Sequence, residues 1–184
     1  TLSSSSAASD VYKRQFSGIG GFRLALEKYG NKCVFSADFN KYACETYSKN
    51  FNDYPLIDIQ KYPEKKIPNH DILCAGFPCQ PFSIGGKRKG FDDVRGTLFF
   101  DIVRILKEKK PKIFILENVR GLVNHNKGKT FKKIINILSN KVNNEHIKNS
   151  RENLGYNIFW KILNSKDYNI PQNRERVFII GFKN

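Results

Sequence analysis

The sequence predicts an α/β fold with a mostly parallel twisted sheet, helices on both faces and a C-terminal antiparallel hairpin. Apolar runs of strand length alternate with amphipathic segments of about 10 to 15 residues, a pattern typical of βαβ units. The last two apolar runs, residues 156–164 and 176–182, are separated only by a polar turn. We therefore expect them to pair as antiparallel neighbours. With 184 residues, the chain suits one domain around a single core.

Helices and strands follow from two different spacings of apolar residues. Helical spacing predicts helices over residues 22–30, 40–51, 97–109 and 130–142. Asn40 is expected to open the second helix, while Gly30 caps the first and Pro111 ends the third. Short apolar runs predict strands over residues 33–38, 55–59, 70–77, 112–118, 156–164 and 176–182. The mostly polar segment 143–153 is expected to be a loop.

The charge balance points to a polyanionic partner. The chain has 32 Lys and Arg against 17 Asp and Glu, a formal net charge of +15. Nucleic acid is the commonest polyanion inside cells, although an A/T-rich genome also enriches a surface in Lys and Asn. No run approaches the roughly 20 apolar residues that span a bilayer. We expect a soluble, cytoplasmic protein with no membrane partner.

The four cysteines differ in their surroundings. Cys33, Cys44, Cys74 and Cys79 have neither the paired spacing of a zinc site nor a secreted context, so we expect reduced thiols and no metal. Cys79 stands between two prolines in "GFPCQPFS". The prolines restrict the backbone and present the thiol in few conformations. A proline turn that merely ends a strand is the structural alternative.

A glycine-rich turn precedes the first expected helix. In "FSGIGG", Gly18, Gly20 and Gly21 allow a tight turn and close approach of the backbone to a ligand at the helix N-terminus. Asp38 ends the next expected strand, where a carboxylate can accept hydrogen bonds from a ribose. The pattern alone also fits a plain strand-to-helix turn, or an oxidoreductase that binds a nicotinamide dinucleotide.

Five motifs considered together are more specific than any one of them. "FSGIGGFRLAL", "GFPCQPFS", "RGTLFFDI", "ENVRGL" and "QNRERVFIIG" follow one another in this order. As an ordered set they resemble the cytosine-5 DNA methyltransferases of bacterial restriction-modification systems, from Phe16 to Asn184. The resemblance implies a Rossmann-like, S-adenosyl-L-methionine-dependent methyltransferase fold. It also implies methyl transfer to C5 of a flipped-out cytosine in DNA, through a covalent bond between Cys79 and C6.

The resemblance also assigns roles to individual residues. Cys79 matches the nucleophile, Glu117 the group at the cytosine N3 and N4 edge, and Arg176 the contact to O2. The S-adenosyl-L-methionine pocket is expected to comprise Phe16, Gly18, Gly20, Asp38, Asp58, Ile59 and Leu98. Residues 84–96 resemble the family's mobile catalytic loop. Expected DNA contacts are Gln80, Ser83, Lys87, Arg88, Lys89, Arg95 and Arg174. A solvated basic loop, and an acid partner for Arg174, are the structural alternatives.

Two departures from the family pattern concern the ends of the chain. Arg14 stands where the family's opening strand normally has an acid, and Lys13 and Gln15 are also polar. We therefore expect residues 1–15 to be a non-native or disordered leader, and residues 16–184 to be the catalytic domain. A target-recognition domain and a returning segment are expected to be missing, so that the fold is incomplete and the chain alone is weakly active or inactive.

The partners follow from the resemblance. The expected partners are double-stranded DNA and a cognate restriction endonuclease of the same system, which is a functional partner and need not bind the protein. We expect a monomer. One branch of the family acts on RNA, so a tRNA cytosine-5 methyltransferase is an alternative. A noncatalytic DNA-binding remnant is another.

Overall fold

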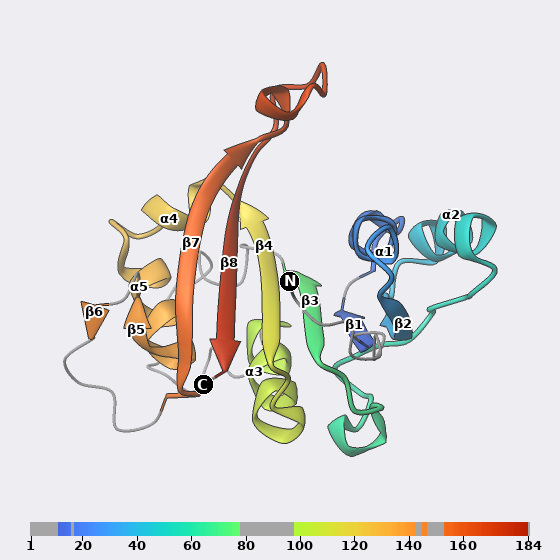
Figure 1. The fold of residues 1–184 in the computed structure, drawn as a ribbon, viewed down its shortest axis with the longest axis horizontal. Helices are drawn as coiled ribbons and strands as arrows, with labels where there is room; N and C mark the ends of the chain where they lie inside the picture. The colour runs from blue at the N-terminus through green and yellow to red at the C-terminus, as the bar shows by residue number, and fades with distance from the viewer. Residues whose placement is uncertain (1–10, 16, 78–97, 143–144, 147–152, 184) are drawn as a thin grey trace, which may run out of the picture.

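The computed structural model describes residues 11–15, 17–77, 98–142, 145–146 and 153–183. Within them one mixed sheet forms the centre of the molecule, with the strand order β2-β1-β3-β4-β8-β7-β5-β6 (Figure 1). Its strands are β1 Val11–Gln15, β2 Lys32–Ala37, β3 Ile72–Gly76, β4 Ile113–Val119, β5 Ser139–Val142, β6 Glu145–His146, β7 Tyr156–Asn164 and β8 Glu175–Lys183.

The strand directions confirm the predicted sheet. β2, β1, β3 and β4 pair in parallel, and β8 is antiparallel to both β4 and β7. The β7–β8 hairpin pairs continuously from Tyr156 opposite Lys183 to Asn164 opposite Glu175. Its tip extends beyond the rest of the sheet in Figure 1.

The helices are α1 Gly21–Glu27, α2 Lys41–Phe51, α3 Leu98–Lys109, α4 Gly121–Asn124 and α5 Lys129–Leu138. Two 3-10 turns, η1 Glu64–Lys66 and η4 Ser165–Tyr168, complete the described elements. Asn40 caps α2 as predicted, because its side chain accepts a hydrogen bond from the Ala43 amide at 3.1 Å.

Helices cover both faces of the sheet, as the sequence predicts. On one face α3 and α5 bury residues such as Ile102 and Ile134 against Leu116 and Ile179, all at 1% exposure or less. On the other face Phe22 of α1 packs beside the buried Cys74. Burying each large aliphatic side chain contributes about 1.5–3 kcal/mol, so these two layers hold the strand ends in fixed positions.

Three predicted elements differ from the structure. The helix expected over 130–142 ends at Leu138, and residues 139–142 form β5, parallel to β7. Ser139 is fully buried and donates its hydroxyl hydrogen bond to the Tyr156 carbonyl at 2.6 Å. This contact with β7 overrides the helical pattern. Residues 55–59 form only an isolated bridge to Asp38, and part of the expected loop 143–153 forms β6.

β1 lies between β2 and β3, in the place of a central strand. Its backbone pairs in parallel with both neighbours, for example Tyr12 opposite Cys33 and opposite Ile72. Residues 11–15 therefore have strand backbone where the sequence led us to expect a leader. The non-native origin of residues 1–15 stays a prediction.

Candidate active site at the carboxyl ends of the strands

The candidate site lies at one edge of the sheet. β2, β3 and β4 are parallel, so their carboxyl ends meet at this edge, and the antiparallel β8 begins there. In open α/β sheets this edge is where ligands bind. It brings together Glu117 near the end of β4 and Arg176 near the start of β8.

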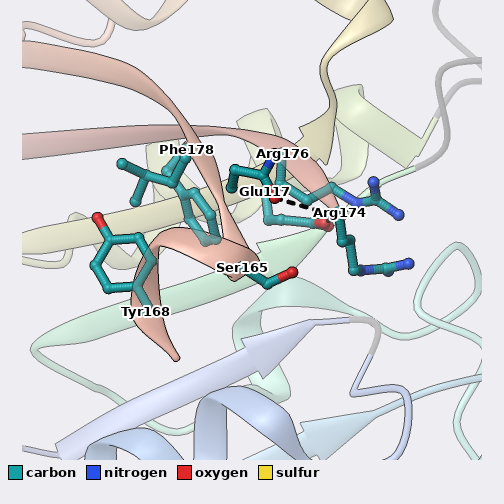
Figure 2. A pocket seen from close by; sticks show the side chains of 8 residues that line it. Glu117, Ser165, Tyr168, Arg174, Arg176 and Phe178 are labelled. Carbon is teal, nitrogen blue, oxygen red and sulfur yellow. Dashed lines mark hydrogen bonds and ion pairs between the residues drawn. The ribbon is translucent and has the colours of Figure 1, made fainter. Parts of the chain in front are cut away.

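Glu117 and Arg176 form an ion pair. Arg176 Nε lies 2.8 Å from Glu117 Oε1, and both side chains are about three-quarters buried (Figure 2). Arg176 Nη1 also donates a hydrogen bond to the Glu175 carbonyl at 2.8 Å. The Glu117 carboxylate and the Glu175 carbonyl together fix the orientation of the Arg176 guanidinium. The Glu117 side chain also lines a pocket.

The pocket beside this pair has a volume of about 390 Å³. It is lined by Glu117, Leu163, Asn164, Ser165, Tyr168, Arg174, Arg176 and Phe178. A mostly apolar cavity of this size with a few convergent polar groups is typical of a small-ligand site. An acceptor on Glu117 and donors on Arg176 suit a planar ring that carries both an amino group and a carbonyl.

Asn118 connects β4 to the end of β3. Its side chain is 3% exposed, and its Nδ2 donates a 2.7 Å hydrogen bond to the carbonyl of Phe77. Phe77 lies two residues before Cys79 in the sequence. Sequence reasoning missed this residue, although an amide at a core-facing position of "IFILENV" was a signal. Through this hydrogen bond, Asn118, which follows Glu117, holds the segment that leads to Cys79.

The glycine loop and Asp38 come together as predicted. Gly18 donates its backbone N–H to Asp38 Oδ2 at 2.7 Å, and Asn40 donates to Oδ1 at 2.9 Å. Each carboxylate oxygen keeps a second lone pair for a hydroxyl donor. Phe39, the next residue, is 66% exposed and was not predicted as a site residue. An open aromatic ring beside a carboxylate suits a nucleoside, whose base can stack while its ribose bonds the acid.

Gly20 is required by packing within the protein. It has φ 105°, and a Cβ there would lie 2.0 Å from Cε2 of Phe51. The sequence predicts that this glycine lets the backbone approach a ligand; in the structure the Phe51 ring fills the space beside it. The Arg23 guanidinium lies 4.6 Å from the centroid of the same ring, so loop, ring and cation form a stack.

Arg23 is the centre of a network that sequence reasoning missed. It donates to Glu27 at 2.7 Å, to the Tyr47 hydroxyl at 3.0 Å and to Asp53 at 3.0 Å. Burial alone would lower the pKa of Arg23, but hydrogen bonds to Tyr47 and Glu27 outweigh it and the pKa is raised. Burial raises the pKa of Tyr47, so its hydroxyl stays protonated. The permanent cation thereby links α1, α2 and the following loop around the glycine turn.

A Gly20→Ala substitution is expected to lower the free energy of unfolding by about 2–4 kcal/mol, because alanine is strained at positive φ and its methyl group meets the Phe51 ring. Urea unfolding of the purified protein measures this. Gly21→Ala is the matched control. A Cβ at Gly21 has nothing within 4 Å and lies at the start of α1, so alanine should be neutral or stabilising by up to about 1 kcal/mol. Equal effects of the two substitutions would contradict the packing argument.

The remaining cofactor residues occupy different environments. Asp58 is partly exposed, with Lys61 Nζ 3.4 Å from its carboxylate. Ile59 is 2% exposed and packs in the core, and its carbonyl accepts a hydrogen bond from Arg104. Leu98 begins α3 and packs against the same core.

Several predicted site residues lie outside the described part of the chain. They are Phe16, Cys79, Gln80, Ser83, Lys87, Arg88, Lys89 and Arg95. Of the predicted DNA contacts, Arg174 lies within the described part of the chain. Its side chain is exposed and lines the pocket together with Arg176.

The fold and the strand-edge site define the class of protein. The structure has a glycine turn whose acid follows the second strand, and its parallel strands continue into the antiparallel β8–β7 hairpin. This arrangement is the Rossmann-like methyltransferase fold. The chain matches the family C-5 cytosine-specific DNA methylase over residues 15–184, and it belongs to that family.

Curated relatives and solved structures agree with this assignment. The chain is 52% identical to Type II methyltransferase M.HhaI of Haemophilus parahaemolyticus over 169 residues, which cover 92% of the chain and 48% of that protein. It is 51% identical to M.HpaII of Haemophilus parainfluenzae, with 91% and 44% covered. The crystal structure of S. pombe Dnmt2 methyltransferase superposes with a TM-score of 0.70 at 25% identity, covering 95% of this chain and 51% of that one. The chain thus spans about half the length of these relatives.

Proposed function

We propose that the chain is the catalytic half of an enzyme that transfers a methyl group from S-adenosyl-L-methionine to C5 of cytosine in DNA. The observation that carries this proposal is the Glu117–Arg176 pair, whose side chains lie 2.8 Å apart and line one pocket. Glu117 pairs in the sheet with Gly76, three residues before Cys79. The similarity to curated Type II methyltransferases supports DNA as the substrate.

The proposed chemistry divides the work among three side chains. The Cys79 thiolate adds to C6 of the cytosine, and the ring electrons move toward C5, which becomes nucleophilic. Glu117 bonds the N3 and N4 edge and shares a proton with N3, so that charge on the ring is dispersed. Arg176 donates to O2, as an oxyanion donor would. After C5 has gained the methyl group, a base removes the C5 proton, the bond to C6 breaks and the thiolate is released.

S-adenosyl-L-methionine supplies an electrophilic methyl group when it is bound. The residues of this chain fit it: Asp38 has free lone pairs for ribose hydroxyls, and Phe39 offers an open ring for the adenine. Asp58 follows Ile57, whose backbone N–H donates a 2.9 Å hydrogen bond to the Asp38 carbonyl, so a second acid lies in the neighbouring segment. Ile59 is buried and Leu98 is partly buried against the core, so these apolar side chains suit a wall beside the cofactor.

The experiment that tests the function uses the polypeptide extended to the length of its relatives (the full-length protein). Incubated with tritium-labelled cofactor, it should place label on C5 of cytosine in duplex DNA, and more slowly or not at all on tRNA. The 184-residue chain alone should transfer little or none. Transfer to tRNA alone would establish the RNA alternative, whereas salt-sensitive DNA binding without transfer would establish a noncatalytic remnant.

A functional pairing with a restriction endonuclease of the same system follows from the same proposal. DNA modified by the full-length protein should resist cleavage by that endonuclease. Binding of a nicotinamide dinucleotide in place of S-adenosyl-L-methionine would instead favour the oxidoreductase alternative.

A further inference from the structure

The tip of the β7–β8 hairpin is closed by one side chain. Asn164, the last residue of β7, is 8% exposed. Its Oδ1 accepts hydrogen bonds from the backbone amides of Lys166 at 3.3 Å and Arg174 at 3.0 Å, and its Nδ2 donates to Asn173 Oδ1 at 2.6 Å. A single buried amide therefore joins both ends of the turn.

Ser165 reinforces this closure. Its backbone N–H donates to the Arg174 carbonyl at 3.1 Å, and its hydroxyl donates to the Gln172 carbonyl at 2.6 Å. Both backbone polar groups of Arg174 are thus hydrogen-bonded to the Asn164–Ser165 pair. The backbone of Arg174 is therefore held by the two residues at the start of the turn.

Arg174 is an uncommitted cation at the pocket. It extends in the same direction as Arg176 and lines the same pocket (Figure 2). Arg176 is paired with Glu117, and the intervening Glu175 is paired with Arg120 at 2.6 Å. Within the described part of the chain, no ion pair of Arg174 with an acid is found within 4.0 Å, because Glu117 and Glu175 pair with other arginines. The guanidinium of Arg174 is therefore available to a bound anion.

We infer that Asn164 is a positioning residue that presents Arg174 to a phosphate of the DNA strand that carries the target cytosine. The inference rests on the proposed function. A nucleotide carries base and phosphate on one sugar, so a base held by Glu117 and Arg176 places a phosphate near the mouth of this pocket. Arginine binds phosphate with two parallel hydrogen bonds, which makes its backbone placement matter. Phosphate contacts of this kind set the register of the strand.

The test compares the salt dependence of DNA binding by full-length variants. Arg174→Ala should reduce the slope of log affinity against log salt by about 0.9, the value for one lost phosphate contact. Asn164→Leu should reduce the slope by the same amount, although it removes no charge. The double variant should equal either single variant, because both act through one contact. Affinity for S-adenosyl-L-methionine should be unchanged in all three.

Lys166→Ala is the matched control. It also removes a cation from the tip of the hairpin, but Lys166 does not line the pocket. It should leave the slope unchanged. If Asn164→Leu does not fold, Asn173→Ala replaces it, because it removes one bond at the exposed turn. This variant should weaken DNA binding about threefold in the wild-type background and not at all in the Arg174→Ala background.

A wild-type slope in Asn164→Leu, or additive losses with Arg174→Ala, would overturn the inference. Equal losses of affinity from Asn173→Ala in both backgrounds would overturn it as well. Failure of the proposed function has a different signature, because the wild-type full-length protein would then transfer no methyl group to DNA.

Discussion

A Cys79→Ser variant of the full-length protein is expected to lose methyl transfer by at least about 10⁴-fold, or about 5 kcal/mol of barrier. A thiolate is a far better nucleophile toward C6 than a hydroxyl, and no histidine stands beside this position in the sequence to activate serine. The variant should still bind DNA and S-adenosyl-L-methionine. Single-turnover transfer of labelled methyl groups measures the rate.

The same variant can be used to test whether Cys79 forms a covalent bond to C6 of the cytosine. DNA with 5-fluorocytosine at the target cannot lose the C5 substituent as a proton, so the wild-type enzyme should be trapped as an adduct at the peptide containing Cys79. Cys79→Ser should form none. Cys33→Ser is the matched control, because Cys33 Sγ lies 3.2 Å from Ser36 Oγ and a hydroxyl can keep that contact. Undiminished transfer by Cys79→Ser, or an adduct at another cysteine, would refute the mechanism.

A Glu117→Gln variant is expected to lower kcat by about 10²–10³-fold while KM for DNA changes little. Glutamine keeps the size of the side chain and can hydrogen-bond the N3 and N4 edge, but it cannot share a proton with N3. The lost interaction therefore belongs to the transition state, which lowers kcat without weakening ground-state binding.

Glu108→Gln on the exposed side of α3 is the control for the loss of one negative charge. It should have a kcat within about twofold of wild type. A rise in KM with kcat unchanged in Glu117→Gln would show that the carboxylate contributes only to binding. That result would remove its proposed role in dispersing charge.

The proximity of some candidate site residues was predictable where short motifs contain them. Glu117 and Arg176 were identified from "ENV" and "RER", and the structure places them 2.8 Å apart. Gly18 and Asp38 were likewise expected together, and they share a 2.7 Å hydrogen bond. Such residues can be proposed from the sequence because the expected chemistry requires a particular residue type at a particular place in a motif.

The residues that hold the site in place were not predictable. Asn118 bonds a carbonyl 41 positions away, and Arg23 bonds a hydroxyl 24 positions away. Asn164 looks in the sequence like an ordinary polar residue at a turn. Its hydrogen bond to Arg174 depends on the pairing of β7 with β8, which brings the amide of Arg174 to 3.0 Å from Asn164 Oδ1.

From the order of its elements and its short motifs, the sequence alone determined a mostly parallel α/β sheet, its antiparallel hairpin and the residues that we propose for the reaction. Those properties depend on local periodicity and on short motifs. Only the tertiary structure decided that residues 139–142 leave the helix to join the sheet, and that the Phe51 ring is the reason for Gly20. Both outcomes depend on contacts between distant segments, whose free energy exceeds the weak local preferences that a sequence displays.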